Sequence, residues 1–154
     1  MTQRHPLPAF MRAAEVYSRD KSVPSLAALA VASAEWSFTA RGLNAGRELL
    51  ARMPYNSDAV EWSDANFDHT YNAAWWPTEI PVLRLWGEDD RIVSELGWGA
   101  STYGMPNVIE RPIADAGHFP WIDNSEAVAR AFRGFVQALR APDAYTQPAP
   151  TGPA

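Results

Sequence analysis

An acid and a histidine, each placed after a stretch that predicts a strand, are the residues of this sequence most suited to catalysis. Gly87 closes one apolar run and is followed by acidic residues at 88–90, and His118 follows Gly117 in a second loop, 28 residues beyond Asp90. A carboxylate that accepts a hydrogen bond from one imidazole nitrogen fixes the ring tautomer, and the other nitrogen can then take a proton from a nucleophile. The spacing therefore predicts that Asp90 and His118 form the orienting pair of a nucleophilic triad.

Other roles for these side chains stay open. A loop acid after a strand is often a solvated turn residue or a helix cap, and this is the alternative for Asp89 and Asp90. A metal site is the alternative for His118 and Asp115, together with the acid and histidine at 68–69. No H-E-x-x-H or comparable ligand spacing occurs in the sequence. We therefore expect neither a metal nor a cofactor.

Two predicted strands must position the pair. An almost continuous apolar run at 80–86 is typical of a strand buried on both faces of a parallel sheet, and residues 108–113 predict a second strand. A helix is expected between them, around 95–103. Because a right-handed crossover joins parallel neighbours, the loops that carry Asp90 and His118 should open at the same edge of the sheet.

Helices are predicted on both sides of this unit. The segments with helical patterns before it are 7–19, 25–38, 43–53 and an aromatic stretch at 64–76, with breaks that contain Pro or Gly. The last helix is expected to begin with a D-x-x-E capping box at 123–126 and to carry an apolar face as far as Leu139. The Pro-rich residues 142–154 predict a disordered tail.

Composition limits the location and the partners of the protein. With 154 residues, of which 47% are hydrophobic, the chain is suited to one small folded domain. A net charge of −5 argues against nonspecific binding to nucleic acid. No segment offers the roughly 20 apolar residues that span a bilayer. The N-terminus has no signal-peptide pattern, and there is no Cys. We expect a cytoplasmic protein that binds neither nucleic acid nor membrane.

Two segments together resemble the last part of an α/β-hydrolase. They are IPVLRLWGEDDRIV at 80–93 and NVIERPIADAGHFPWID at 107–123, in which G-x-x-D is similar to the family's acid motif and G-H to its histidine motif. The resemblance covers about residues 77–141. It implies that Asp90, rather than Asp89, is the triad acid and that His118 is the general base.

The same resemblance implies a plan for the whole chain. In a partial α/β-hydrolase fold, residues 1–76 are a helical cap and residues 77–141 are a strand-helix-strand-helix unit of the parallel sheet. The sequence ASAEWSFTARGLNAGRELLARMPYN in the first region is similar to proline-iminopeptidase-like members. On that likeness Glu35 is a candidate for holding a substrate's amino group, and a surface-facing glutamate is the alternative.

The nucleophile of that family is missing from this sequence. No G-x-S-x-G elbow occurs, and the nearest segment, at Ser101, lacks the second glycine and follows the acid instead of preceding it. An HGG-type oxyanion loop is missing as well. We therefore expect the C-terminal half of a hydrolase for ester, amide or peptide bonds, acting on a small molecule or short peptide. The nucleophile is then expected in a missing N-terminal half, either upstream of this sequence or on a separate polypeptide. The alternative is a noncatalytic truncated relative that acts as a binding module, and self-association is a further expectation.

Overall fold

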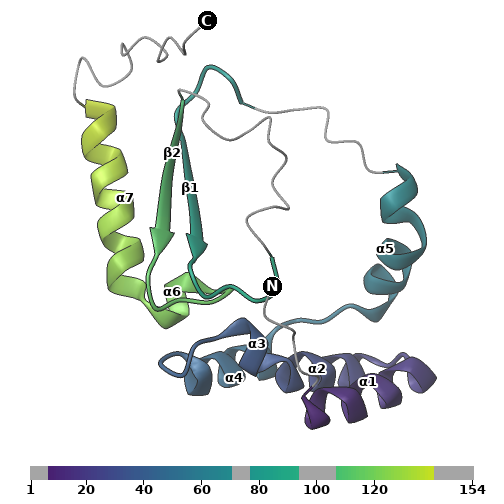
Figure 1. Cartoon of the computed structure of the whole chain (residues 1–154). Coiled ribbons are helices and arrows are strands. Elements are labelled where there is room, and N and C mark those ends of the chain that lie inside the picture. Colours follow the sequence, from purple (N-terminus) through teal and green to yellow (C-terminus); the bar gives the residue numbers. More distant parts are fainter. Residues whose placement is uncertain (1–6, 71–76, 94–106, 141–154) are drawn as a thin grey trace, which may run out of the picture.

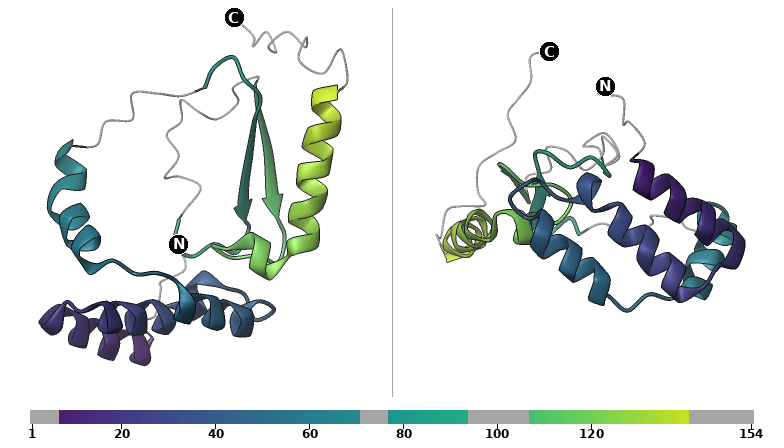
Figure 2. Two further views of the ribbon diagram at one scale, coloured as in Figure 1. Left: turned by 180° about the vertical axis from the view of Figure 1, so that it is seen from behind. Right: turned by 90° about the horizontal axis from the view of Figure 1, so that it is seen from below.

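The computed structural model describes residues 7–70, 77–93 and 107–140 as a mixed α/β structure. In these ranges a two-stranded parallel sheet is combined with helices α1 to α7. Figure 1 shows helices α1–α4 as a layer beneath the arrowheads of both strands, with α7 alongside the sheet. Seen from behind and from below, α5 and α7 lie on opposite sides of the structure (Figure 2). None of the described helices has the length and hydropathy needed to cross a membrane.

The helical layer packs around a small apolar core. Its helices are α1 (Pro8–Asp20), α2 (Val23–Ala32), α3 (Ala34–Ser37) and α4 (Leu43–Arg52), and α5 (Ser57–Thr70) follows. The helices predicted at 7–19 and 43–53 are confirmed to within one residue. Ala34, Phe38 and Leu50 are buried together, and Phe119 from the second half of the chain packs against them. The layer is therefore joined to the sheet region by apolar contact.

Two predicted helix boundaries were wrong. The helix predicted at 25–38 is broken at Ser33, whose ψ of −2° ends α2 and whose hydroxyl donates to the carbonyl oxygen of Ala30 over 2.8 Å. The helix predicted at 64–76 begins earlier, at Ser57, because the side-chain oxygen of Asn56 accepts from the Ala59 amide over 3.0 Å. Its predicted end at 71–76 lies outside the described residues.

The two strands run parallel as neighbours. They are β1 (Val82–Gly87) and β2 (Val108–Ile113), paired in register from Val82 opposite Val108 to Gly87 opposite Ile113. The second strand has the bounds that the sequence predicted, whereas the first begins two residues later than expected. Most of β1 is only half-buried, so the expectation of burial on both faces was wrong for the described part. The helix predicted at 95–103 and the tail at 142–154 lie outside the described residues.

The last helix covers one face of the sheet. Helix α6 (Pro120–Asp123) and helix α7 (Ser125–Arg140) follow β2 in the chain. On α7, Val128 is buried against Ile113 of β2. The predicted capping box was wrong, because Asn124 caps α7 by accepting from the Ala127 amide over 3.3 Å. Asp123 is free to turn inward, where it meets a different set of donors.

The junction between α1 and α2 predicts a pH effect on stability. The Asp20 carboxylate accepts from the Ser22 amide over 2.9 Å and from the Ser25 hydroxyl. These bonds, the Ser22 amide first, hold the pKa of Asp20 below its ordinary value of 3.8. A depressed folded pKa stabilises the fold above the ordinary pKa, and this stabilisation is lost as the pH falls through the lowered value.

Asp20→Asn should therefore lower the melting temperature near neutral pH, and the difference from wild type should shrink between about pH 5 and about pH 3. Thermal melts followed by circular dichroism at each pH measure this difference. A difference that does not change with pH would contradict the assignment of an ionised Asp20 at this junction.

Candidate functional site

The ends of β1 and β2 bring an acid and an imidazole into contact. The loops after the strands are joined by hydrogen bonds from the Glu88 amide to the Ile113 carbonyl (3.0 Å) and from the Asp89 amide to the Ala116 carbonyl (2.9 Å). In this arrangement Oδ2 of Asp90 lies 3.0 Å from Nδ1 of His118. The sequence predicted that these two side chains lie together, and the structure confirms this contact. Their catalytic roles stay a prediction.

The carboxylate of Asp90 is held by its own loop. Its Oδ1 accepts from the amides of Ile92 (2.7 Å) and Val93 (3.1 Å), which leaves Oδ2 for His118. The Asp90 side chain is 10% exposed and that of His118 is 33% exposed. Asp89, by contrast, is exposed to solvent. The geometry thus separates the two neighbouring acids, of which only Asp90 faces the imidazole.

His118 is fixed through its backbone and its ring. Its amide donates to the Ser37 carbonyl at the end of α3 over 2.8 Å. The imidazole meets the Phe119 ring edge-on at 5.0 Å, and Phe119 stacks on Phe38, also at 5.0 Å. Among the described residues no hydrogen bond engages Nε2. A carboxylate without a proton only accepts, so this contact favours the tautomer with the proton on Nδ1, which leaves Nε2 as the acceptor.

Asp123 anchors the histidine loop and was not identified as a site residue from the sequence. Its side chain is buried, with 2% of the residue exposed. The carboxylate accepts from the Gly117 amide (2.7 Å), the Thr39 amide (3.1 Å) and the Thr39 hydroxyl (3.1 Å). The D-x-x-E pattern favoured a cap, and no signal in the sequence separates an acid that caps a helix from one that turns inward.

The glycine before the histidine allows this close approach. A Cβ at Gly117 would lie 2.6 Å from the carbonyl oxygen of Ser37, which is too close for any other residue. At Gly87, which ends β1, a Cβ would lie 2.1 Å from the Gly117 carbonyl oxygen. Two glycines thus bring β1, the histidine loop and α3 into contact.

Of the other candidate residues, the structure describes Asp115 and Glu35. Asp115 has a φ of 53° and turns the chain after β2. Ser101 and the side chains at 68–69 lie outside what the structure describes. Within the described ranges, no group of three His, Asp or Glu side chains has the spacing of a metal site. Glu35 is paired with Arg47 over 3.0 Å, with both side chains about half exposed.

Comparison of this chain with models of known protein families, with curated proteins and with solved structures finds no match. The function of this chain is therefore inferred from the geometry of the pair. A carboxylate, an imidazole with an open Nε2 and an anchored loop together form a unit that can remove a proton from a nucleophile.

The tautomer of His118 is the first testable property of this site. We expect proton-coupled nitrogen spectra to give a protonated Nδ1 and an unprotonated Nε2 in the neutral ring. Asp90→Asn should shift the ring toward the other tautomer, since the amide can donate to Nδ1. Asp89→Asn is the matched control and should leave the spectrum unchanged. An Asp90→Asn spectrum identical to wild type would show that the contact does not set the tautomer.

The anchor predicts a large effect on stability. Asp123→Asn presents amide hydrogens to donors and leaves buried groups unpaired, so we expect a loss of about 3 kcal/mol in the free energy of unfolding. Asp89→Asn, at an exposed position, should stay within about 0.5 kcal/mol of wild type. Urea denaturation followed by tryptophan fluorescence compares the two. A loss at Asp123 no larger than at Asp89 would refute the anchoring role.

Proposed function

We propose that this chain supplies the acid and the general base of a serine hydrolase with the α/β-hydrolase fold. The observation that carries the proposal is the 3.0 Å contact between Asp90 and His118 at the carboxyl ends of adjacent parallel strands. Catalytic groups of open parallel sheets gather at that edge. The resemblance of segments 80–93 and 107–123 to the family supports the same assignment. The bond cleaved is an ester, amide or peptide bond of a small molecule or short peptide.

In the proposed reaction, Nε2 of His118 accepts the proton of a serine hydroxyl while the serine oxygen attacks the carbonyl carbon. The same proton passes to the leaving group when the tetrahedral intermediate collapses. Asp90 keeps Nδ1 protonated and stabilises the imidazolium that forms between these steps. The serine and the oxyanion donors belong to another segment or polypeptide, since no G-x-S-x-G occurs in this sequence.

The helical layer fits the place of a cap in this proposal. Helices α1–α4 lie at the carboxyl ends of β1 and β2, on the side where the pair is formed (Figure 1). The Ser37 carbonyl at the end of α3 accepts from His118, so the layer directly contacts the general base. A layer in this position would restrict access to the reacting groups and exclude water from them.

A noncatalytic binding module is the second candidate. Three apolar residues on α7 support it, because Phe132, Val136 and Leu139 are 53%, 41% and 43% exposed. Apolar residues in this arrangement mark a surface that is covered by another part of an assembly. The same surface suits a hydrolase half that packs against its complement or against a second copy. A measurement of enzymatic activity therefore distinguishes the hydrolase from the binding module, whereas a measurement of association does not.

Reconstitution tests the proposal. The chain is joined to the N-terminal half of an α/β-hydrolase that contains G-x-S-x-G, and ester turnover is measured after circular dichroism has established folding. His118→Ala should lower turnover by about 10⁴-fold, and Asp90→Asn should cost nearly as much. Asp89→Asn should stay within about twofold, as expected for an exposed loop acid.

Equal losses for Asp89→Asn and Asp90→Asn, or an active His118→Ala variant, would overturn the catalytic assignment. A fluorophosphonate probe provides the second readout. It should label the serine of the added half and leave the 154-residue chain alone unlabelled. Stoichiometric labelling of the chain alone would place a nucleophile in this sequence and contradict the division of roles.

A further inference from the structure

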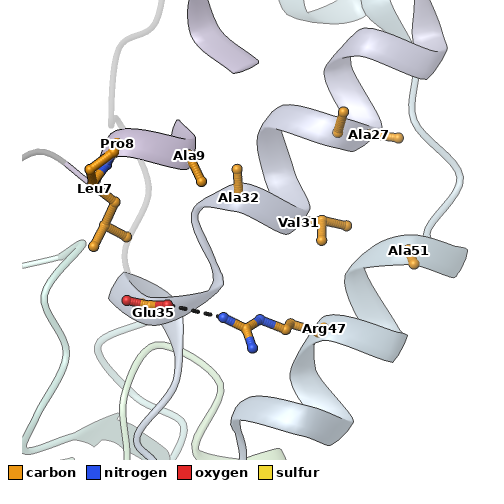
Figure 3. A pocket seen from close by; sticks show the side chains of 10 residues that line it. Leu7, Pro8, Ala9, Ala27, Val31, Ala32, Glu35, Arg47 and Ala51 are labelled. Atoms are coloured by element: carbon orange, nitrogen blue, oxygen red, sulfur yellow. Dashed lines mark hydrogen bonds and ion pairs between the residues drawn. The ribbon is translucent and has the colours of Figure 1, made fainter. Parts of the chain in front are cut away.

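An open cavity lies at the surface of the helical layer, between the start of α1, helix α2 and helix α4, and its lining residues are half-buried or exposed. Its volume is about 610 Å³, and its lining residues are Leu7, Pro8, Ala9, Ala27, Ala28, Val31, Ala32, Glu35, Arg47 and Ala51. Figure 3 shows these side chains facing a common space, with Glu35 and Arg47 together at one end. The volume is within the range of small-molecule sites in proteins, roughly 300–1,000 Å³.

The walls of the cavity are apolar and short. Five alanines, on α1, α2 and α4, contribute methyl groups where a larger side chain would fill the space. Leu7, Pro8 and Val31 supply the remaining apolar surface. These apolar side chains give no hydrogen bonds to a polar ligand, whereas they favour an apolar one by removing its surface from water.

The two charges at the end of the cavity neutralise each other. Nη2 of Arg47 lies 3.0 Å from Oε1 of Glu35, and the two side chains are 45% and 49% exposed. At this exposure the pair contributes little to the stability of the fold. A charged ligand would lose its hydration against apolar walls and meet no net opposite charge. A neutral ligand avoids that loss of hydration, which argues against the role of Glu35 as a binding site for an amino group.

One short helix connects the cavity with the acid-histidine pair. At Glu35 of α3, the carbonyl oxygen lies 3.5 Å from Nη1 of Arg91, the residue after Asp90. At Ser37 of the same helix, the carbonyl accepts from the His118 amide. The charged end of the cavity is therefore linked through α3 to the loops that carry the proposed catalytic groups.

We propose that this cavity binds the neutral aliphatic part of a substrate, such as the alkyl chain of an ester. Its role as a substrate site rests on the proposed hydrolase function, whereas binding itself needs no turnover. The apolar chain fills the space among the alanines. The bond to be cleaved lies beyond the Glu35 end, toward Asp90 and His118.

Binding is measured with the full chain and Nile red, a neutral dye that fluoresces in apolar surroundings. Ala51→Phe fills the cavity and should lower the affinity for Nile red by at least about tenfold. Ala45→Phe is the matched control, because Ala45 is exposed on the same helix outside the cavity. It should change the affinity by less than about twofold. Ala28→Phe, from α2, provides a second filled cavity.

Displacement of the dye by octanol, octanoate and octylamine identifies the ligand class. Octanol should displace Nile red at about a tenth of the concentration that the two charged compounds need, because it alone enters without loss of charge hydration. Glu35→Gln leaves Arg47 without its partner, and octanoate should then gain at least about threefold relative to octanol.

Equal affinities of Ala51→Phe, Ala28→Phe and wild type for the dye would refute the cavity as a binding site. If octylamine displaces Nile red at a lower concentration than octanol does, the proposal of a neutral ligand is refuted. That result would instead support Glu35 as the binding site for an amino group. Octanol binding that is lost in Ala51→Phe, combined with a reconstituted enzyme that is inactive, would refute the proposed function alone. An active enzyme whose turnover of octyl esters is unaffected by Ala51→Phe would refute the cavity as the substrate site.

Discussion

The buried carboxylate of Asp123 is the interaction on which the arrangement of this molecule depends. Removing a carboxylate from water is expensive unless hydrogen-bond donors replace the water, and here the donors come from Gly117 and Thr39. Thr39 is 84 positions away in sequence and belongs to the segment after α3. Neither segment can satisfy the carboxylate alone. The free-energy cost of burying Asp123 is therefore offset only when the loop after β2 and the helical layer are assembled. These hydrogen bonds make the association specific, in addition to the apolar contacts that stabilise it.

This constraint explains why the proposed catalytic pair and the proposed binding cavity are both in contact with the same short helix, α3. Helix α3 has only four residues, too few to be stable by itself. Its position is set by the Asp123–Thr39 bonds that follow it, by the stacked rings of Phe38 and Phe119, and by the contact of Ser37 with the His118 amide. The same contacts that hold α3 therefore hold the histidine, and Glu35 at the edge of the cavity is carried with them.

The periodicity of the sequence predicted most helices and strands. The predictions were wrong where a single polar side chain determines a helix boundary or a tertiary contact. β2 was predicted at its observed bounds, and α4 followed from a Gly before it and a Pro after it. Ser33 ends α2 by a hydrogen bond to the preceding turn, although the helical pattern of the sequence continues past it. Asn56 begins α5 by capping it, although the sequence pattern predicted a later start for that helix. The prediction that Asp123 caps a helix was wrong for a more general reason. Whether an acid caps a helix or is buried depends on the partner that tertiary structure brings to it, and Thr39 could not be paired with it from sequence spacing.

The contact between Asp90 and His118 was predictable because topology alone creates it. Parallel neighbours end at one edge of a sheet, so an acid after one strand and a histidine after the next are brought together whatever lies between them. The orientation of each ring and carboxylate needs more than topology. Asp90 owes its orientation to two amides of its own loop, whereas His118 owes its orientation to the helical layer through Ser37 and Phe119. A strand pair of this kind therefore places the acid unaided, but it can present an oriented histidine only with the helical layer in place, and this dependence gives the layer a part in orienting His118.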